Sequence, residues 1–310
     1  PNIPPTKRIR EVLANAALDP KNYVYAINDL PELIKAVIAW YKKRYEVILE
    51  DDEICSLLGS QEGLAHLAMT LINDSDIVLV PNPSYPIFKD GPLLANANIV
   101  DMPLKEENNY LIDFAKKYQI IVLHDNAYSE LLFEGLGRSF LSYPGAKDVG
   151  IEFNSLSKTY GLAGARIGFA VGNKAIIEQL KTLKSNMDYG MFIPIQLAAI
   201  EAITGEQNCV IKTREAYQRR RDIFLKCAQE IGWNIKETKG TMFIWAKIPS
   251  LYQKSIDFVN DLFEQTGILF IPGSAFGSEG EGYIRIALIQ DEEIIKKAFI
   301  KMKATNIFKN

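Results

Sequence analysis

The chain has 310 residues, of which 48% are hydrophobic and 24% are charged, so it is long enough for about two globular domains. Its 35 basic and 38 acidic residues leave a net charge of −3, and no run of Lys or Arg is long enough to follow a nucleic-acid backbone. Three scattered cysteines, with no signal peptide and no apolar stretch of membrane-spanning length, predict a reduced cytoplasmic protein without a nucleic-acid or membrane partner.

Apolar strands alternate with helices in the first half of the chain. Helices are predicted over 5–18, where Thr6 is placed as the N-cap, and over 30–45, where Pro31 falls in the first turn. This alternation favours an α/β fold whose mostly parallel sheet is covered on both faces. The predicted strands lie at 53–58, 76–81, 99–102, 120–125, 149–155 and 165–171, and a glycine turn after the first opens a helix over 59–72.

The second half of the chain predicts a different organisation. Helical patterns cover 175–185, 194–204 and 208–231. Strands at 241–248 and 282–289 then mix with helices at 255–267 and 291–304, which is typical of a small α+β domain. We therefore predict a small-domain part over 1–20, a large domain over 21–205, and an interdomain helix with the rest of the small domain over 206–310.

One connection in the large domain is too short. A crossover between parallel strands needs a dozen or more residues, yet the stretch before the strand at 120–125 holds hardly any helix. We therefore predict that a segment is missing between Phe114 and Ala115. The chain also starts at Pro1 without a methionine, so it is expected to be shorter than its gene product.

The stretch NSLSKTYGLAGARIGFA (154–170) carries the strongest chemical signal. An exposed lysine after a strand is its plainest interpretation. A serine nucleophile in Ser-x-x-Lys would need S-D-N and K-T-G partners, and the sequence has neither. A third interpretation makes Lys158 a Schiff-base lysine whose pKa is lowered by burial and by Arg166. With the hydroxyls of Ser155 and Ser157 and the glycines, this combination suits pyridoxal 5'-phosphate (PLP), an aldehyde on a ring that carries a phosphate.

Two other stretches offer what such a ring requires. Asp125 ends an apolar strand, where open α/β sheets place ligand groups, and a buried carboxylate there keeps a pyridine nitrogen protonated. An aspartate that caps a helix is an equally good interpretation of Asp125. Tyr128 follows within reach of a ring hydroxyl. Ser60 and Gln61 open a helix after a Gly-Ser turn, where free N–H groups bind phosphate.

Along nearly its whole length the chain resembles a class I/II aminotransferase of PLP fold type I. SLSKTYGLAGARIG (155–168) matches the S-x-S-K…R-x-G signature, and HDNAYSEL (124–131) matches D-x-A-Y. PNPSYPIF (81–88), YIRIAL (283–288) and NYVYAINDLPEL (22–33) match three further elements in the family's order. The resemblance implies a large α/β domain, a small α+β domain and bound PLP.

The resemblance also implies a role for each matching residue. Lys158 forms the Schiff base, and Ser155, Ser157 and Arg166 hold the phosphate. Asp125 pairs with the pyridine nitrogen, Tyr128 with the ring oxygen, and Tyr85 stacks on the ring; Lys158, Asp125 and Tyr85 are the predicted catalytic residues. Arg285 binds the substrate α-carboxylate through a bidentate fork. Tyr25, in preference to Tyr23, reaches the cofactor phosphate of a neighbouring subunit, which predicts a homodimer with shared active sites.

The activity implied is ping-pong transamination between an amino acid and a 2-oxo acid. Four stretches (28–33, 59–67, 143–160 and 183–192) resemble the LL-diaminopimelate aminotransferase branch or its aspartate/alanine-type relatives. A PLP-dependent C–S lyase and an aromatic or kynurenine-type aminotransferase remain alternatives. A non-catalytic regulator of this fold would carry a DNA-binding helix-turn-helix, for which the sequence has neither room nor basic charge.

The chain also departs from the family pattern. In the family, the asparagine of an Asn-Pro-x-Gly element binds the ring hydroxyl, and this sequence has no such element. Its expected place in the chain is the junction of Phe114 and Ala115. The resemblance also leads us to expect a glycine-bearing N-terminal arm before the position of Pro1. His66 and His124 are interpreted as structural, since no pattern pairs them as metal ligands, and no metal is predicted.

Overall fold

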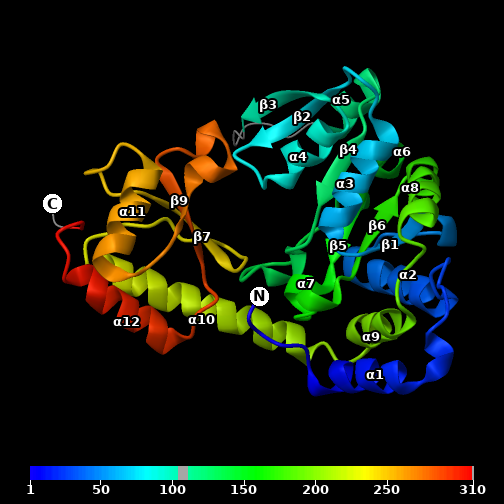
Figure 1. Cartoon of the computed structure of the whole chain (residues 1–310), viewed down its shortest axis with the longest axis horizontal. Helices are drawn as coiled ribbons and strands as arrows, with labels where there is room; N and C mark the ends of the chain where they lie inside the picture. The colour runs from blue at the N-terminus through cyan, green and yellow to red at the C-terminus, as the bar shows by residue number, and fades with distance from the viewer. Residues whose placement is uncertain (104–110, 309–310) are drawn as a thin grey trace.

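The computed structural model describes residues 1–103 and 111–308, and Figure 1 shows them arranged as two lobes. The larger lobe is an α/β structure, and the smaller lobe combines a short sheet with helices. Helix α10 (Asn208–Glu230) runs from one lobe to the other along one side of the molecule (Figure 1). The predicted fold, a large α/β part with a small α+β part, is confirmed.

The large lobe follows the predicted order of strands and helices. Thr6 caps α1 by accepting the N–H of Ile9 at 3.3 Å, and Pro31 is the first residue of α2. The elements are α1 (Lys7–Leu18), α2 (Pro31–Tyr45), β1 (Ile54–Leu57), α3 (Ser60–Leu71), β2 (Ile77–Asn82), α4 (Ile87–Leu94), β3 (Asn98–Pro103), α5 (Leu111–Tyr118), β4 (Val122–Asp125), α6 (Ala146–Val149), β5 (Gly150–Ser155), α7 (Leu156–Thr159), β6 (Gly168–Gly172), α8 (Lys174–Met187) and α9 (Ile193–Thr204). Helix α5 runs without a break through Phe114 and Ala115.

The strands of the large lobe form two sheets. The first has the order β1-β6-β5-β4, in which β4 and β5 are parallel and β6 is antiparallel to both of its neighbours. The second contains β2 and β3, which are parallel. Within the described residues no ladder joins β2 to β4, so the single mostly parallel sheet that the strand pattern suggests is divided in two.

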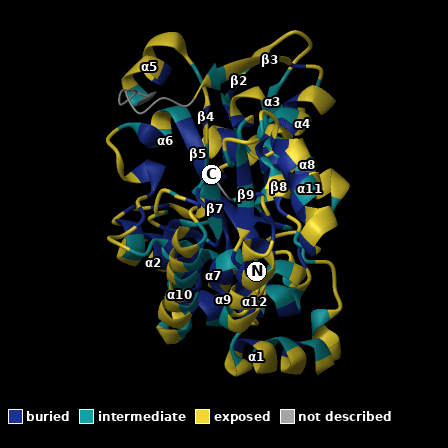
Figure 2. Ribbon diagram, turned by 90° about the vertical axis from the view of Figure 1, so that its left-hand side faces the viewer, coloured by how far each residue is buried: buried dark blue, intermediate teal, exposed yellow. Residues whose placement is uncertain are grey.

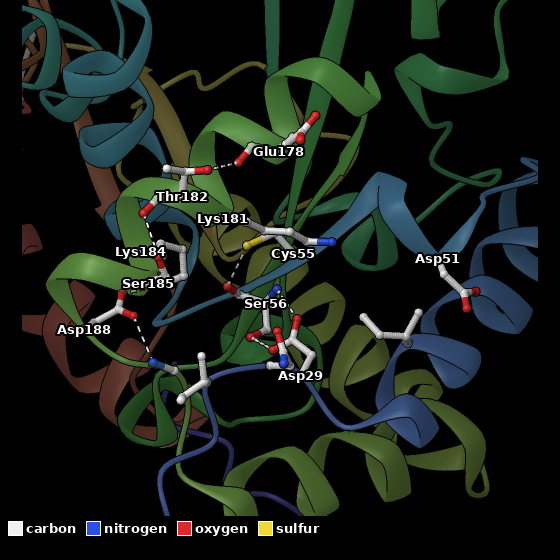
Figure 3. Close-up of a pocket in the computed structure, with 14 residues that line it drawn as sticks. Asp29, Asp51, Cys55, Ser56, Glu178, Lys181, Thr182, Lys184, Ser185 and Asp188 are labelled. Carbon is white, nitrogen blue, oxygen red and sulfur yellow. Dashed lines mark hydrogen bonds and ion pairs between the residues drawn. The ribbon is translucent and has the colours of Figure 1, made fainter.

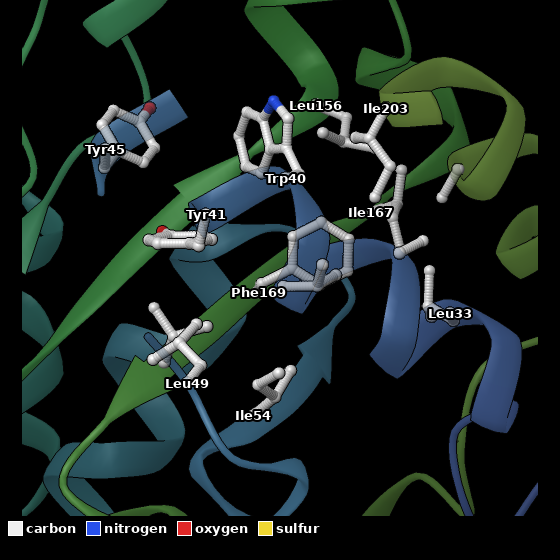
Figure 4. Packing of buried hydrophobic residues seen from close by; sticks show 14 of the residues in the cluster. Leu33, Trp40, Tyr41, Tyr45, Leu49, Ile54, Leu156, Ile167, Phe169 and Ile203 are labelled. Carbon is white, nitrogen blue, oxygen red and sulfur yellow. The ribbon is translucent and has the colours of Figure 1, made fainter. Parts of the chain in front are cut away.

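Both faces of the four-stranded sheet are covered. On one face Tyr41, Leu156, Phe169 and Ile203 belong to a core formed with α2 and α9 (Figure 4). On the other face Phe153 packs among residues of α3 and α8. Alternate residues of β6 enter opposite cores, which is the pattern of a strand buried on both sides.

The small lobe has its own sheet and core. Its elements are β7 (Phe243–Lys247), α11 (Ser255–Thr266), β8 (Ile271–Pro272), β9 (Tyr283–Ala287) and α12 (Glu292–Lys303), and the sheet has the antiparallel order β7-β9-β8. Tyr217 and Phe224 extend from α10 into this core, so the connecting helix is part of its packing.

The N-terminal residues contact both lobes. Helix α1 lies along α9, and Ile9 belongs to the core of the large lobe. Asn2 accepts a hydrogen bond from Arg220 of α10 at 2.9 Å. The domain bounds 1–20, 21–205 and 206–310 stay a prediction.

Candidate active site

The predicted site residues come from several elements of the fold. Asp125 is the last residue of β4, and Lys158 lies in α7 directly after β5. Gly59 and Ser60 lie where β1 turns into α3, and Arg285 lies in β9 of the small lobe. Because β1, β4 and β5 end at one edge of their sheet, their carboxyl ends bring Asp125, Lys158 and the beginning of α3 together.

Lys158 is held at the start of a short helix. Ser155 is the N-cap of α7, and its hydroxyl accepts the N–H of Ser157 at 3.2 Å. Burial lowers the pKa of Lys158, the charge of Arg166 lowers it further, and Asp125 opposes the change. Arg285 also lowers this pKa, so Arg166, Asp125 and Arg285 all lie within electrostatic range of Lys158. A lowered pKa raises the share of the neutral, nucleophilic amine at neutral pH.

Asp125 is half-buried, and one of its carboxylate oxygens is a buried acceptor that the described residues leave unused. Burial raises its pKa from 3.8 to about 6, against a backbone hydrogen bond from Ala127 and the charges of His124 and Lys158. Its Oδ1 is buried and accepts no hydrogen bond from the described residues. A buried carboxylate without a donor is costly, so this oxygen fits a ligand that brings a protonated nitrogen.

An anion cradle lies between Arg166 and the beginning of α3. A Cβ atom at Gly59 would lie 2.3 Å from a guanidinium nitrogen of Arg166, so the guanidinium rests against the backbone at that point. Gly59 is the N-cap of α3 and provides no side chain to cap its first N–H groups. Ser60 is half-buried and Gln61 is exposed. Free N–H groups at a helix N-terminus beside a guanidinium suit a phosphate.

Arg285 is positioned by two aromatic rings. Its guanidinium lies 4.5 Å from the ring centres of both Phe243 and Phe276. Burial lowers its pKa, and Tyr128 and Tyr85 oppose this change. The Nε atom is buried and has no hydrogen-bond partner among the described residues. A guanidinium fixed in this way with an unused donor fits a carboxylate.

The three predicted tyrosines occupy different environments. Tyr128 lies beside Phe243, with ring centres 6.0 Å apart, and burial followed by the charge of Asp125 raises its pKa to about 12. Tyr85 precedes α4 and is 47% exposed. Tyr25 is 82% exposed and packs against Tyr189. The electrostatic contacts thus group Tyr85 and Tyr128 with Arg285, whereas Tyr25 lies on the surface.

Sequence reasoning missed a link between β2 and the small lobe. The buried side chain of Asn82 donates to Ser278 at 3.0 Å and accepts the N–H of Glu279 at 3.2 Å. The N–H of Ser84 donates to the carbonyl of Phe276 at 2.8 Å. Since the ring of Phe276 also packs against the guanidinium of Arg285, this link joins β2 to the contacts that hold Arg285. In the sequence, the one sign of this link between β2 and the small lobe is a polar Asn at the end of an apolar strand.

Glu152 is a second residue that sequence reasoning missed. It is fully buried in β5 and accepts hydrogen bonds from Tyr41 at 3.0 Å, Ser139 at 3.0 Å, the Phe140 N–H at 2.7 Å and His124 at 2.8 Å. A glutamate inside the apolar run 149–155 was the available signal. His124 is adjacent to Asp125 in β4, so this network fixes the strand that carries the candidate ring partner.

A separate pocket of about 380 Å³ lies beside β1 and α8 (Figure 3). Two of its carboxylates have donors within the lining: Ser56 donates to Asp29, and Lys184 donates to Asp188 at 2.6 Å. The same ammonium donates at 2.8 Å to Glu62, which belongs with His66 and Asp188 to a group of metal-capable side chains. Because a lysine already supplies the positive charge there, we place the chemistry at Lys158; the absence of a metal stays a prediction.

Comparison with known proteins agrees with this geometry. The family model of aminotransferase class I and II matches residues 2–116 and 110–298. The chain belongs to this family. No described helix has the length and apolar character needed to cross a membrane.

Three relatives illustrate the similarity. The LL-diaminopimelate aminotransferase of Halothermothrix orenii is 41% identical over 99% of this chain and 89% of its own length. The glutamate-pyruvate aminotransferase AlaC of Escherichia coli is 36% identical over 96% of this chain and 82% of its own length. The apo structure of BacF from Bacillus subtilis superposes with a TM-score of 0.96 at 32% identity, over 100% of this chain and 90% of its own.

The first of these alignments is longer than the chain. It extends over 348 positions, whereas the chain has 310 residues, so at least 38 positions of the alignment have no residue here. The two stretches that match the family model overlap at residues 110–116, in the part of the chain between β3 and β4.

Proposed function

We propose that this aminotransferase holds PLP in the cluster around Lys158 and transfers the amino group of LL-diaminopimelate to a 2-oxo acid. The observation that carries the cofactor proposal is the buried, unpartnered Oδ1 of Asp125 beside an amine of lowered pKa. PLP supplies an aldehyde that takes up the amino group and a pyridinium ring that withdraws electrons.

The described residues fit each part of PLP. Asp125 would hold the protonated ring nitrogen, and Tyr128 would donate to the ring oxygen. Tyr85 would cover the ring face. The phosphate would bind in the cradle of Arg166 and the first turn of α3, and its ligands would be Ser60, Gln61, Ser155, Ser157 and, from a second subunit, Tyr25.

Two side chains would act on the substrate. The neutral amine of Lys158 would remove the α-proton and return it on the other side of the reaction, because burial and Arg166 lower its pKa. Arg285 would bind the α-carboxylate, held in place by Phe243 and Phe276. Closure of the two lobes around the substrate would exclude water, since Arg285 and Lys158 lie on different lobes.

The test of this mechanism uses two lysine variants. We expect Lys158→Ala to lose turnover by at least about a thousandfold, which is the size of effect typical of a lost covalent or general-base group. Lys174→Ala, at an exposed salt bridge to Asp52, should keep wild-type activity. Borohydride should attach the cofactor permanently to the peptide that contains Lys158; attachment elsewhere would refute the assignment.

The substrate proposal depends on the relatives' names. LL-diaminopimelate is favoured by the relative from Halothermothrix orenii, and L-alanine is the second candidate because of AlaC. Turnover should be measured with 2-oxoglutarate or pyruvate as acceptor and with a panel of donors that includes aspartate, aromatic amino acids and kynurenine. Release of ammonia and pyruvate without an acceptor would instead identify a C–S lyase.

We also propose a cytoplasmic homodimer. An exposed apolar patch, which we call the tyrosine patch, supports a second copy as partner; it consists of Tyr23, Val24, Tyr25, Ile27, Met187, Tyr189 and Phe192. A patch of this kind on a single chain is typical of an interaction surface. Light scattering should give a dimer, and Tyr25→Ala should weaken cofactor binding without moving Arg166. A monomer with full activity would refute the shared site.

A further inference from the structure

The turn between β1 and α3, which forms the anion cradle, is held from one side by Glu62. Glu62 is the third residue of α3, and its Oε2 accepts the N–H of Leu58 at 2.9 Å. In the usual capping box the third residue of a helix bonds the N–H of the N-cap, which here is Gly59. Glu62 reaches one residue further back. Among the described residues, the N–H groups of Gly59, Ser60 and Gln61 therefore donate no hydrogen bond and stay available to a ligand.

The other side of the turn lies against β6. A Cβ atom at Gly168 would lie 3.2 Å from the N of Ser60 and 3.4 Å from the carbonyl carbon of Gly59, so the turn packs directly on the backbone of this strand. The strands β5 and β6 are buried along their whole length (Figure 2). Because Arg166 precedes Gly168 by two residues, one short segment provides both the guanidinium and the floor of the turn. With this floor fixed, the direction of the N–H groups depends on the contact that Glu62 makes.

A buried lysine holds the other oxygen of Glu62. The ammonium of Lys184 extends from α8 and donates to Glu62 Oε1 at 2.8 Å and to Asp188 Oδ2 at 2.6 Å. The side chain of Lys184 is only 9% exposed. Burial lowers the pKa of Lys184, but its hydrogen bonds to Asp188 and Glu62 outweigh burial and raise it, so the side chain is a cation at neutral pH. Glu62 is thus fixed at both oxygens, by the backbone of the turn and by α8.

Charge explains why Glu62 is paired with a lysine. A carboxylate in the first turn stabilises a helix, yet it also repels a phosphate that binds at the same helix end. The ammonium of Lys184 offsets this charge and leaves Glu62 bonded to Leu58. Building on the proposed function, on which this inference rests, we propose that Glu62 and Lys184 are positioning residues for the cofactor phosphate. Glu62 orients the N–H groups of the turn, and Lys184 fixes Glu62 and offsets its charge.

A double-mutant cycle on the cofactor-free protein tests the pair. Calorimetric titration gives the Kd for two probes, inorganic phosphate and PLP, and EDTA keeps metal ions away from Glu62, His66 and Asp188. Lys184→Met leaves the charge of Glu62 beside the phosphate and should raise both Kd values at least about tenfold. The double variant Glu62→Gln/Lys184→Met lacks this charge and should bind both probes at least about fivefold more tightly than Lys184→Met alone.

Two neutral variants at position 62 test the hydrogen bond to Leu58 separately. Glu62→Gln keeps an acceptor oxygen and Glu62→Ala does not, so Glu62→Ala should bind phosphate about 3–10-fold more weakly, the contribution of about one hydrogen bond. Glu32→Ala removes an exposed carboxylate from the first turn of α2 and should leave both Kd values unchanged. Phe258→Leu loosens the core of the small lobe and should lower Tm without changing the Kd for phosphate.

Recovery of affinity in the double variant, together with weaker binding by Glu62→Ala than by Glu62→Gln, supports the proposal. Losses that add in the double variant, equal affinities of the two variants at position 62, or the same loss in Phe258→Leu would overturn it. A wild type that binds phosphate but no PLP would refute the cofactor proposal and leave the phosphate cycle valid. A wild type that binds PLP with an additive cycle would refute this inference alone, and a wild type that binds neither probe would refute both.

Discussion

Asp125→Asn should stabilise the cofactor-free protein while it weakens the site. Burial raises the pKa of this carboxyl from 3.8 to about 6, so the folded protein binds its proton more tightly than the unfolded chain does. A group with a raised folded-state pKa contributes stability below its unfolded pKa and loses that contribution as pH rises through the folded pKa. The rise from 3.8 to about 6 corresponds to about 3 kcal/mol lost between about pH 4 and pH 6.

Asparagine has the same shape and cannot ionise, so it avoids this loss. We expect urea unfolding of the cofactor-free variant at pH 7 to show a free energy of unfolding about 1–3 kcal/mol above that of the wild type. At pH 4 the two proteins should differ by much less, because Asp125 is then largely protonated in the folded state. The Ala127 N–H can still donate to the amide oxygen, so the local turn is retained.

Cofactor binding should change in the opposite direction. Without the carboxylate the ring nitrogen loses its counter-charge, and we expect the Kd for PLP to rise at least about tenfold. The reasoning is refuted if the stability difference between variant and wild type is the same at pH 4 and pH 7. It is also refuted if Asp125→Asn is less stable than the wild type at pH 7, since the charged carboxylate would then be stabilised by a contact that the structure does not contain.

Three further substitutions test other parts of the molecule. Glu152→Gln should lower the free energy of unfolding by about 3–5 kcal/mol in urea titrations, because an amide cannot accept hydrogen bonds from all four donors. The control is Glu264→Gln at an exposed position, which should have no effect. Equal losses of stability in the two variants would contradict the buried network. Gly59→Ala should weaken binding of PLP at least about tenfold in equilibrium dialysis. The backbone φ at Gly59 is +89°, and the new Cβ would lie 2.3 Å from a guanidinium nitrogen of Arg166. The control variant Gly164→Ala has open space around its new Cβ and should bind PLP normally. Arg285→Lys should raise KM for the amino acid by about 10–100-fold with a smaller change in kcat, since the bidentate fork is lost; an unchanged KM would place the carboxylate elsewhere.

The sequence was most informative where strands end in polar residues. The apolar strand before Asp125 predicted that its side chain lies where open α/β sheets place ligand groups, and in the structure Asp125 affects the pKa of Lys158. The direction of β6 could not be predicted, because a buried strand is apolar on both faces in either orientation. The same ambiguity hid the division into two sheets, since the pattern of β2 and β4 does not show which strands they pair with.

Glu152 was hidden for a different reason. Its hydrogen-bond donors come from α2, from β4 and from the loop at 139–140, which are far apart in the chain. A buried charge is retained only where such donors converge, and convergence is a property of the folded chain. Asn82 belongs to the same class, because its partner Ser278 lies in the other lobe.

The charges of the site explain why it needs an anionic ligand. Lys158, Arg166 and Arg285 supply three cations against the single carboxylate of Asp125, and the desolvation that lowers the pKa of Lys158 and Arg285 makes their repulsion costly. A phosphate monoester brings a charge of about −1.5 to −2 at neutral pH, and an α-carboxylate brings one more. Under the proposed function, a phosphorylated cofactor near Arg166 in the large lobe and an amino-acid carboxylate near Arg285 in the small lobe would offset this excess of positive charge.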